Sequence, residues 1–199
     1  MNSSRIFGGS KSEEYWEKRY RDGGKSGQGS VGLARDWKWS VIQKHVSQVE
    51  DVVDVGCGDL SFWEGRTCER YIGIDISPHI IRRNSEKRPD WAFVARPAEK
   101  RLPLRGRVVL CLDVLFHILD DETAMGIMEN LCEYSSEWVI IHAWWRNPFE
   151  GKVNDGLYQA YRPLDKALFS GRGFDCVEES PAPEEVNPYG AMYIFKKRA

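Results

Sequence analysis

Two aspartates lie on segments rich in β-branched residues and could bind a nucleoside. The first segment, Val52–Val55, contains Asp54 and runs directly into the turn Gly56-Cys57-Gly58-Asp59. The second segment ends at Asp75, sixteen residues after Asp59. Glycine lets the backbone approach a ligand where a Cβ would collide, and a carboxylate at a strand end accepts hydrogen bonds from the hydroxyls of a ribose. This spacing predicts a nucleoside that lies across the ends of the two strands.

The same arrangement begins a dinucleotide-binding domain. A site for a single nucleoside therefore has to be distinguished from a site for a dinucleotide. A dinucleotide site requires the pattern G-x-G-x-x-G. Here Ser61 occupies the position of the third glycine, so the chain departs from the dinucleotide pattern.

A helix is expected directly after the turn, because its free N–H groups would face a negative group on the ligand.

From about Val52 to Phe195 the chain resembles the class I S-adenosylmethionine-dependent methyltransferases. The motifs that carry the resemblance are Asp54–Gly58, Asp75, Ala98-Glu99 with Leu102-Pro103-Leu104, and Leu112–Ile118. The resemblance implies S-adenosyl-L-methionine as the cofactor, with Asp54 helping to hold its amino-acid end. The cofactor-binding residues that it implies here are Asp54, Gly56, Gly58, Asp59, Asp75, Ile76, Ala98, Asp113 and Val114.

Further upstream, Tyr15–Tyr20 and Ser26–Ser30 resemble the N-terminal cap of small-molecule methyltransferases, the thiopurine type among them. The resemblance implies that aromatic and loop residues close over the cofactor, with Trp16, Tyr20 and Gly27 on its methionine side. Residues 1–36 would then be a cap, and residues 1–199 a single methyltransferase domain.

Two positions depart from the family pattern. Leu60 stands where many members have a third glycine, so we expect a variant turn whose backbone approaches the ligand less closely. Pro97 stands where an aspartate often binds the adenine amino group. Adenine would then depend on backbone groups near Ala98 and on apolar stacking against Ile76.

Two histidines are candidates for proton transfer from an acceptor. His117 lies four residues after Asp113, and His142 ends a predicted strand. A neutral imidazole can take the proton of a hydroxyl, thiol or amine. A structural role remains the alternative for both, as does a helix-capping role for Asp113. We name His117 as the catalytic candidate, and no group of residues suggests a metal site.

The elements that must position these residues alternate between strands and helices, which is typical of a doubly wound α/β domain. We expect a seven-stranded, mostly parallel sheet in a Rossmann-like fold whose last strand is antiparallel. The predicted strands are 51–55, 71–75, 91–95, 108–113, 138–142, 174–178 and 191–195. The predicted helices are 12–21, 37–49, 121–134 and 163–170.

The composition is that of a soluble protein without a general attraction to nucleic acid or membranes. The 199 residues carry a formal net charge of −2, and 42% of them are hydrophobic. The five cysteines form no CxxC pair, which indicates a reducing compartment. The sequence contains neither the apolar segment of a signal peptide nor an apolar segment long enough to span a membrane. We therefore expect a cytoplasmic protein.

The acceptor is expected to be a small molecule, aromatic or sugar-like. An aromatic cluster after the fifth strand could form its pocket or a packed lid, and its members are Trp144, Trp145, Phe149, Tyr158 and Tyr161. Residues 82–107 are rich in Lys and Arg. We read them as a solvated face, although such a stripe could bind phosphates. The alternatives are therefore an RNA or protein methyltransferase, or a cofactor-binding subunit without catalysis, and the oligomeric state stays open.

Overall fold

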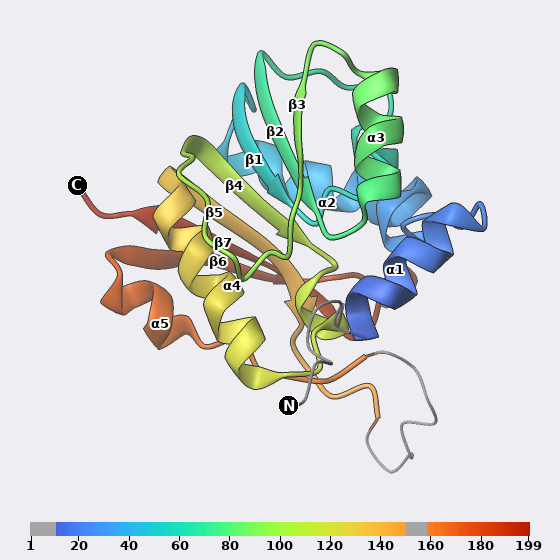
Figure 1. Cartoon of the computed structure of the whole chain (residues 1–199). Coiled ribbons are helices and arrows are strands. Elements are labelled where there is room, and N and C mark those ends of the chain that lie inside the picture. Colours follow the sequence, from blue (N-terminus) through green and yellow to red (C-terminus); the bar gives the residue numbers. More distant parts are fainter. Residues whose placement is uncertain (1–10, 150–158) are drawn as a thin grey trace, which may run out of the picture.

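A seven-stranded sheet with helices on both faces forms the fold (Figure 1). The computed structural model describes residues 11–149 and 159–199. The strand order is β3-β2-β1-β4-β5-β7-β6, and β7 runs antiparallel to both of its neighbours, β5 and β6, whereas the other neighbouring pairs of described strands are parallel. The predicted α/β sheet with an antiparallel last strand is confirmed.

The bounds of the elements follow the apolar segments closely. The strands are β1 (Asp51–Val55), β2 (Arg70–Asp75), β3 (Ala92–Ala95), β4 (Gly106–Leu112), β5 (Ser135–Trp144), β6 (Phe174–Pro181) and β7 (Gly190–Lys197). The α-helices are α1 (Lys11–Arg21), α2 (Gly32–His45), α3 (Pro78–Lys87), α4 (Asp121–Tyr134) and α5 (Lys166–Gly171).

Two hydrophobic cores, one on each face, hold the sheet. Alternate residues of β1 face opposite ways, so Val52 joins one core and Val53 the other. The first core includes Ile42 of α2 and Ile80 of α3, whereas the second is closed by α4 and α5 (Figure 1). Because both faces are covered, the central strands β1 and β4 are almost entirely buried.

Local capping explains where the helices begin. Asp120 accepts a hydrogen bond from the Thr123 amide, which starts α4 at the predicted residue. Asp165 caps α5, so this helix begins at Lys166, three residues later than expected. The helix predicted at 37–49 begins earlier, at Gly32, and ends at His45.

The helix expected directly after the glycine turn is wrong. A 3₁₀ turn, Ser61–Trp63, occupies this place instead. Leu60 has a left-handed backbone (φ 62°), which interrupts the right-handed conformation that an α-helix needs. The first helix after the turn is α3, and Ser77 caps it by accepting from the Ile80 amide.

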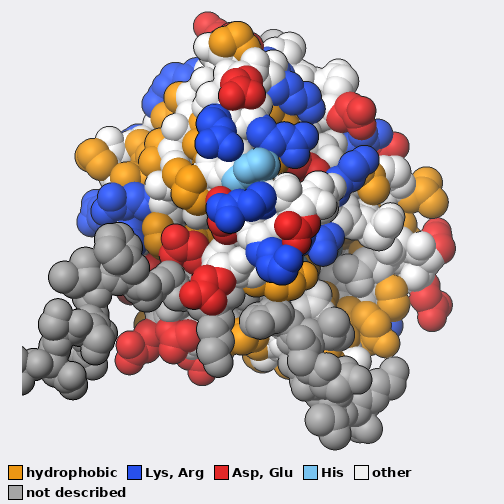
Figure 2. All heavy atoms as spheres, turned by 45° about the vertical axis from the view of Figure 1, so that its right-hand side comes forward, with side chains coloured by type: hydrophobic (Ala, Val, Ile, Leu, Met, Phe, Trp, Pro, Cys, Tyr) orange, Lys and Arg blue, Asp and Glu red, His pale blue; other side chains and the backbone are white. Residues whose placement is uncertain are grey.

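The basic stripe, residues 82–107, lies around β3, at the edge of the sheet. Several of its cations already have partners. Arg88 pairs with Asp90 and lies 3.4 Å from the centre of the Trp91 ring, and Arg101 pairs with Glu133. On the adjoining face, which includes α1 and α3, Lys and Arg alternate with Asp and Glu (Figure 2). This mixture of charges supports a solvated surface.

Within the described residues, no helix combines the length and the apolar character that crossing a bilayer requires.

Candidate functional site

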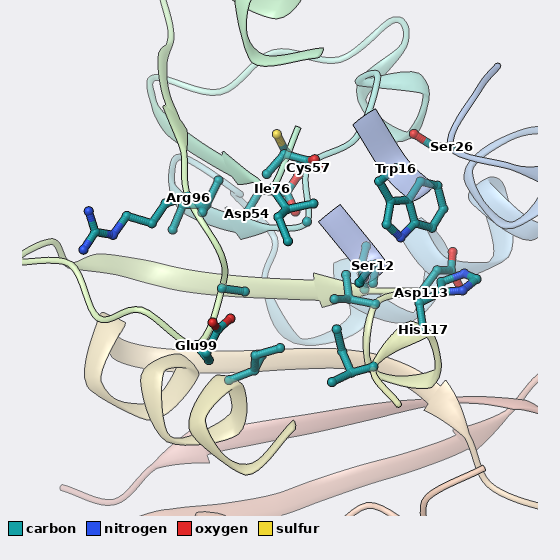
Figure 3. Close-up of a pocket in the computed structure, with 18 of the residues that line it drawn as sticks. Ser12, Trp16, Ser26, Asp54, Cys57, Ile76, Arg96, Glu99, Asp113 and His117 are labelled. Carbon is teal, nitrogen blue, oxygen red and sulfur yellow. The ribbon is translucent and has the colours of Figure 1, made fainter. Parts of the chain in front are cut away.

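A cavity of about 330 Å³ opens at the carboxyl ends of β1, β2 and β4, beneath α1 (Figure 3). The predicted site residues that line it are Trp16, Tyr20, Asp54, Gly56, Asp75, Ile76, Ala98, Asp113, Val114 and His117. Gly27, Gly58 and Asp59 do not line it. Sequence positions 16 to 117 are thus brought together at one sheet edge, where doubly wound folds bind their ligands.

The turn after β1 depends on glycine for both space and backbone conformation. Gly56 and Gly58 have φ angles of 79° and 53°. A Cβ on Gly56 would overlap the Val114 side chain, and one on Gly58 would overlap the Ser26 hydroxyl. Leu60 adopts the same left-handed backbone without being glycine. The variant turn expected at this position therefore keeps the conformation that the missing glycine would favour.

Asp75 ends β2 and its carboxylate faces the turn. Its two oxygens accept hydrogen bonds from the Gly58 amide and the Ser77 amide, each at 3.0 Å. Burial nevertheless raises the pKa of Asp75 to about 6. A carboxylate has further lone pairs beyond these two bonds, so Asp75 can still accept from a ligand in the cavity.

Asp54 is a second buried carboxylate on the cavity wall. One of its oxygens accepts from both the Trp63 indole N–H and the Tyr71 hydroxyl, at 2.8 Å each. Burial raises the pKa of Asp54 to about 6 as well. Two desolvated acids beside one cavity favour a ligand that carries positive charge.

Asp59 contacts the segment that follows α1. Its carboxylate accepts from the Ser26 hydroxyl at 2.8 Å and from the Ser26 and Ser61 amides at 3.2 and 3.0 Å. Asp59 therefore ties the segment after α1 to the glycine turn and does not face the cavity. The Tyr20 hydroxyl lies 3.3 Å from that of Ser26 and supports the same junction.

Helix α1 brings two aromatic rings to the cavity. Trp16 stacks on Tyr20 with ring centres 5.7 Å apart and meets the His117 ring edge-on at 5.0 Å. Glu17, on the same helix, accepts from the Ser77 hydroxyl and from the His79 amide at the start of α3. These contacts fix α1 as one wall of the cavity (Figure 3).

Asp113 lies in a cluster of which the sequence analysis missed one member, Lys38. Asp113, directly after β4, has a left-handed backbone (φ 64°), and its carboxylate pairs with both Lys38 of α2 and His142 of β5. Burial opposes ionisation of Asp113, but Lys38 and His142 outweigh it and hold its pKa well below the usual range. Burial, followed by the charge of Lys38, lowers the pKa of His142. His142 does not line the cavity, whereas His117 does.

The far end of the cavity is formed after β3. Arg96 and Glu99 lie there, away from Trp16 and His117 (Figure 3). The carbonyl oxygen of Ala98 already accepts from the side chain of Asn130 at 2.9 Å. At this end, then, the Glu99 carboxylate is a further polar group on the wall that the sequence analysis did not select.

The aromatic cluster after β5 packs beside the cavity and does not line it. Trp144 stacks on Phe116 with ring centres 4.6 Å apart, and Phe149 meets Trp144 edge-on. The Tyr161 hydroxyl donates to the Trp145 carbonyl. Tyr158 lies outside the described residues.

Comparisons with known proteins agree with this architecture. Residues 53–133 match the family model described as a methyltransferase domain. These residues contain the glycine turn, Asp75 and Asp113. Over these residues the chain is therefore similar to methyltransferase domains. No curated protein sequence matches the chain.

Solved structures share the fold described above over nearly the whole chain. Magnesium protoporphyrin IX methyltransferase from Synechocystis, with bound S-adenosylhomocysteine, has a TM-score of 0.70 at 17% identity, covering 94% of this chain and 98% of its own. The N-methyltransferase NodS from Bradyrhizobium japonicum has a TM-score of 0.69 at 12% identity, covering 96% and 100%. A didemethyltoxoflavin N1-methyltransferase from Burkholderia thailandensis has a TM-score of 0.68 at 15% identity, covering 94% and 87%. At such identities the likeness establishes the fold.

Proposed function

We propose that the protein is an S-adenosylmethionine-dependent methyltransferase that acts on a small-molecule acceptor. The observation that carries the proposal is the cavity itself. One cavity brings the glycine turn and two buried carboxylates together with the aromatic wall of α1, in a chain whose residues 53–133 match the model of a methyltransferase domain.

The residues present suit this cofactor in shape and charge. Asp75 would hold the ribose hydroxyls, and Gly56 leaves room for close approach where a Cβ would overlap Val114. Asp54 and Asp113 would face the positively charged amino-acid end. Ile76 and Ala98 would flank the adenine, and Trp16 and Tyr20 the methionine side, with Val114 between them.

The bound cofactor supplies a methyl group already activated by its sulfonium charge. The chain then contributes alignment and the exclusion of water, which can lower a barrier by several kcal/mol. Trp16 covers the cavity from α1, and its ring contacts His117. We propose His117 as the group that accepts the proton of the acceptor, because it is the histidine that lines the cavity.

A small acceptor is supported by the surroundings of the site. The walls are mainly apolar, and the basic residues near β3 are partly neutralised by neighbouring acids. The solved relatives named above act on a porphyrin and a didemethyltoxoflavin, as their names state. The aromatic rings that line the cavity, Trp16 and Tyr20, would suit an aromatic acceptor.

Two further proposals concern the whole chain. Residues 1–199 form one domain with residues 1–36 as a cap, supported by the contacts of α1 with α3. A cytoplasmic location is supported by the five unpaired cysteines, four of them buried.

Binding and turnover can be tested separately. Titration calorimetry with S-adenosylmethionine and S-adenosylhomocysteine should show one site per chain. Incubation with methyl-labelled cofactor and a fractionated cell extract should place label in the small-molecule fraction. Label in RNA or protein would contradict the acceptor class, and binding without any label transfer would contradict catalysis.

A further inference from the structure

A buried lysine on α2 has no part in the function proposed so far. Lys38 is 1% exposed, although it lies on a helix whose other buried residues are Trp39, Val41 and Ile42. Removing an ammonium group from water is costly unless it is paired and hydrogen-bonded. Its position therefore requires partners, and the structure provides two.

The two partners of Lys38 belong to different parts of the molecule. One is the Asp113 carboxylate beyond β4, and the other is the backbone carbonyl of Gly29, at 3.0 Å. Gly29 belongs to the loop Ser26–Ser30, which links α1 to α2. A Cβ on Gly29 would overlap the Asp113 carboxylate, so the loop lies directly against this acid.

The loop Ser26–Ser30 is therefore attached at both of its ends. At the first end, Ser26 is held by Asp59 of the glycine turn. At the other end, Lys38 joins Gly29 to Asp113. Ser26 and Ser30 both line the cavity, so the loop crosses it from β1 to β4.

We propose that Lys38 is a positioning residue of the cofactor site. Its ammonium fastens the loop Ser26–Ser30 over the methionine side of the cavity and fixes the Asp113 carboxylate that faces it. The inference rests on the proposed function, because it assigns the loop to the methyl donor.

His142 completes the arrangement from the sheet. Its Nδ1 bonds the other oxygen of Asp113, while its Nε2 is buried and has no hydrogen-bond partner among the described residues. The histidine thus supplies one bond, to Asp113. With Lys38 and His142 on opposite oxygens, the carboxylate cannot rotate without breaking a contact.

Hydrogen exchange of the unliganded protein tests the attachment directly. The amides of Ser30 and Val31 bond carbonyls within the loop, whereas the Ser26 amide bonds Asp59. In Lys38→Met we expect exchange at Ser30 and Val31 to accelerate about tenfold or more, and that at Ser26 to change less.

Lys44→Met is the matched control. Lys44 lies on the same helix and also pairs with an acid, Glu178, but it is exposed and distant from the loop. Its variant should exchange like the wild type at Ser30 and Val31. Wild-type exchange in Lys38→Met would overturn the proposal.

Dissociation of S-adenosylhomocysteine, followed by tryptophan fluorescence, tests the link to the cofactor. We expect Lys38→Met to speed dissociation about tenfold with little change in association, because the loop covers a site that is already formed.

Gly29→Ala should have the same effect while leaving Lys38 in place. If Lys38→Met does not fold, the dissociation rate of Gly29→Ala alone tests the proposal. An unchanged dissociation rate in Gly29→Ala and Lys38→Met would overturn the proposal. Failure of the wild type to bind would instead overturn the proposed function, and the exchange comparison would still decide whether Lys38 holds the loop.

Discussion

Asp54 carries two hydrogen bonds on a single carboxylate oxygen, and this makes it a clean site for substitution. Trp63 and Tyr71 both donate to Oδ2. An asparagine could keep both bonds on its one carbonyl oxygen and would remove the charge that burial disfavours.

We therefore predict that Asp54→Asn stabilises the unliganded protein at pH 8. The pKa of Asp54 is raised from 3.8 to about 6, so the native state binds a proton more tightly than the unfolded chain. The stability present at low pH is lost as the pH rises through about 6, and the wild type carries this loss at pH 8. Urea unfolding should show a gain of about 1–3 kcal/mol at pH 8 that disappears near pH 4. A gain of equal size at both pH values would contradict the assignment.

Substitutions of Asp75 and His117 should have different effects, the first on cofactor binding and the second on methyl transfer. We predict that Asp75→Ala weakens S-adenosylhomocysteine binding roughly 100-fold, since hydrogen bonds to a charged group contribute about 1.5–3 kcal/mol each. His117→Ala should bind within about threefold of wild type and keep measurable turnover, because positioning supplies much of the rate. Calorimetry and labelled-methyl transfer measure the two effects.

The control for these two variants is Asp90→Asn, which alters an exposed acid just before β3, at the amino end of that strand and away from the cavity. This variant should leave both the affinity for S-adenosylhomocysteine and the rate of methyl transfer unchanged. Undiminished binding by Asp75→Ala would refute the ribose assignment.

At the scale of elements, one glutamate joins α1 to α3. Glu17 accepts from the Ser77 hydroxyl and the His79 amide. We predict that Glu17→Ala loosens α1 and weakens S-adenosylhomocysteine binding about three- to thirtyfold, the loss of one or two charge-assisted hydrogen bonds. Glu14→Ala, at an exposed position of α1, should bind like wild type. Equal affinities for the two variants would mean that α1 does not contribute to the site.

The sequence predicted the elements where local signals agree with the final packing. Strand β1 and helix α4 were located to the residue, because an apolar segment and the Asp120 cap mark them. The helix expected after Gly58 was wrong because a left-handed leucine cannot be read from residue type.

The candidate site was predictable where residues near in sequence act together, as in the glycine turn. Lys38 was missed because its partner Asp113 lies 75 residues away, and a lone lysine in a helix looks like a surface residue. The hydrogen bond between Asp59 and Ser26 could not be predicted for the same reason, because 33 residues separate the two.

At the scale of the whole molecule, the cap and the sheet should unfold together. Three contacts connect the N-terminal helices to the rest of the molecule. Ser26 bonds Asp59 after β1, Lys38 bonds Asp113 after β4, and Glu17 bonds Ser77 before α3. We predict a single calorimetric transition, which saturating S-adenosylhomocysteine raises by about 5–10 °C at 100 times its dissociation constant. Two resolved transitions, with only the later one shifted by ligand, would contradict the single domain.

The buried acids beside the cavity have a consequence for the end of the reaction. Asp54 and Asp75 lie out of reach of most solvent, so they respond strongly to the charge of whatever occupies the space. On the proposed function, the donor is a cation at sulfur and the spent product is neutral there. The same carboxylates that favour the donor therefore lose an attraction once the methyl group has left, and turnover itself promotes exchange of product for fresh donor.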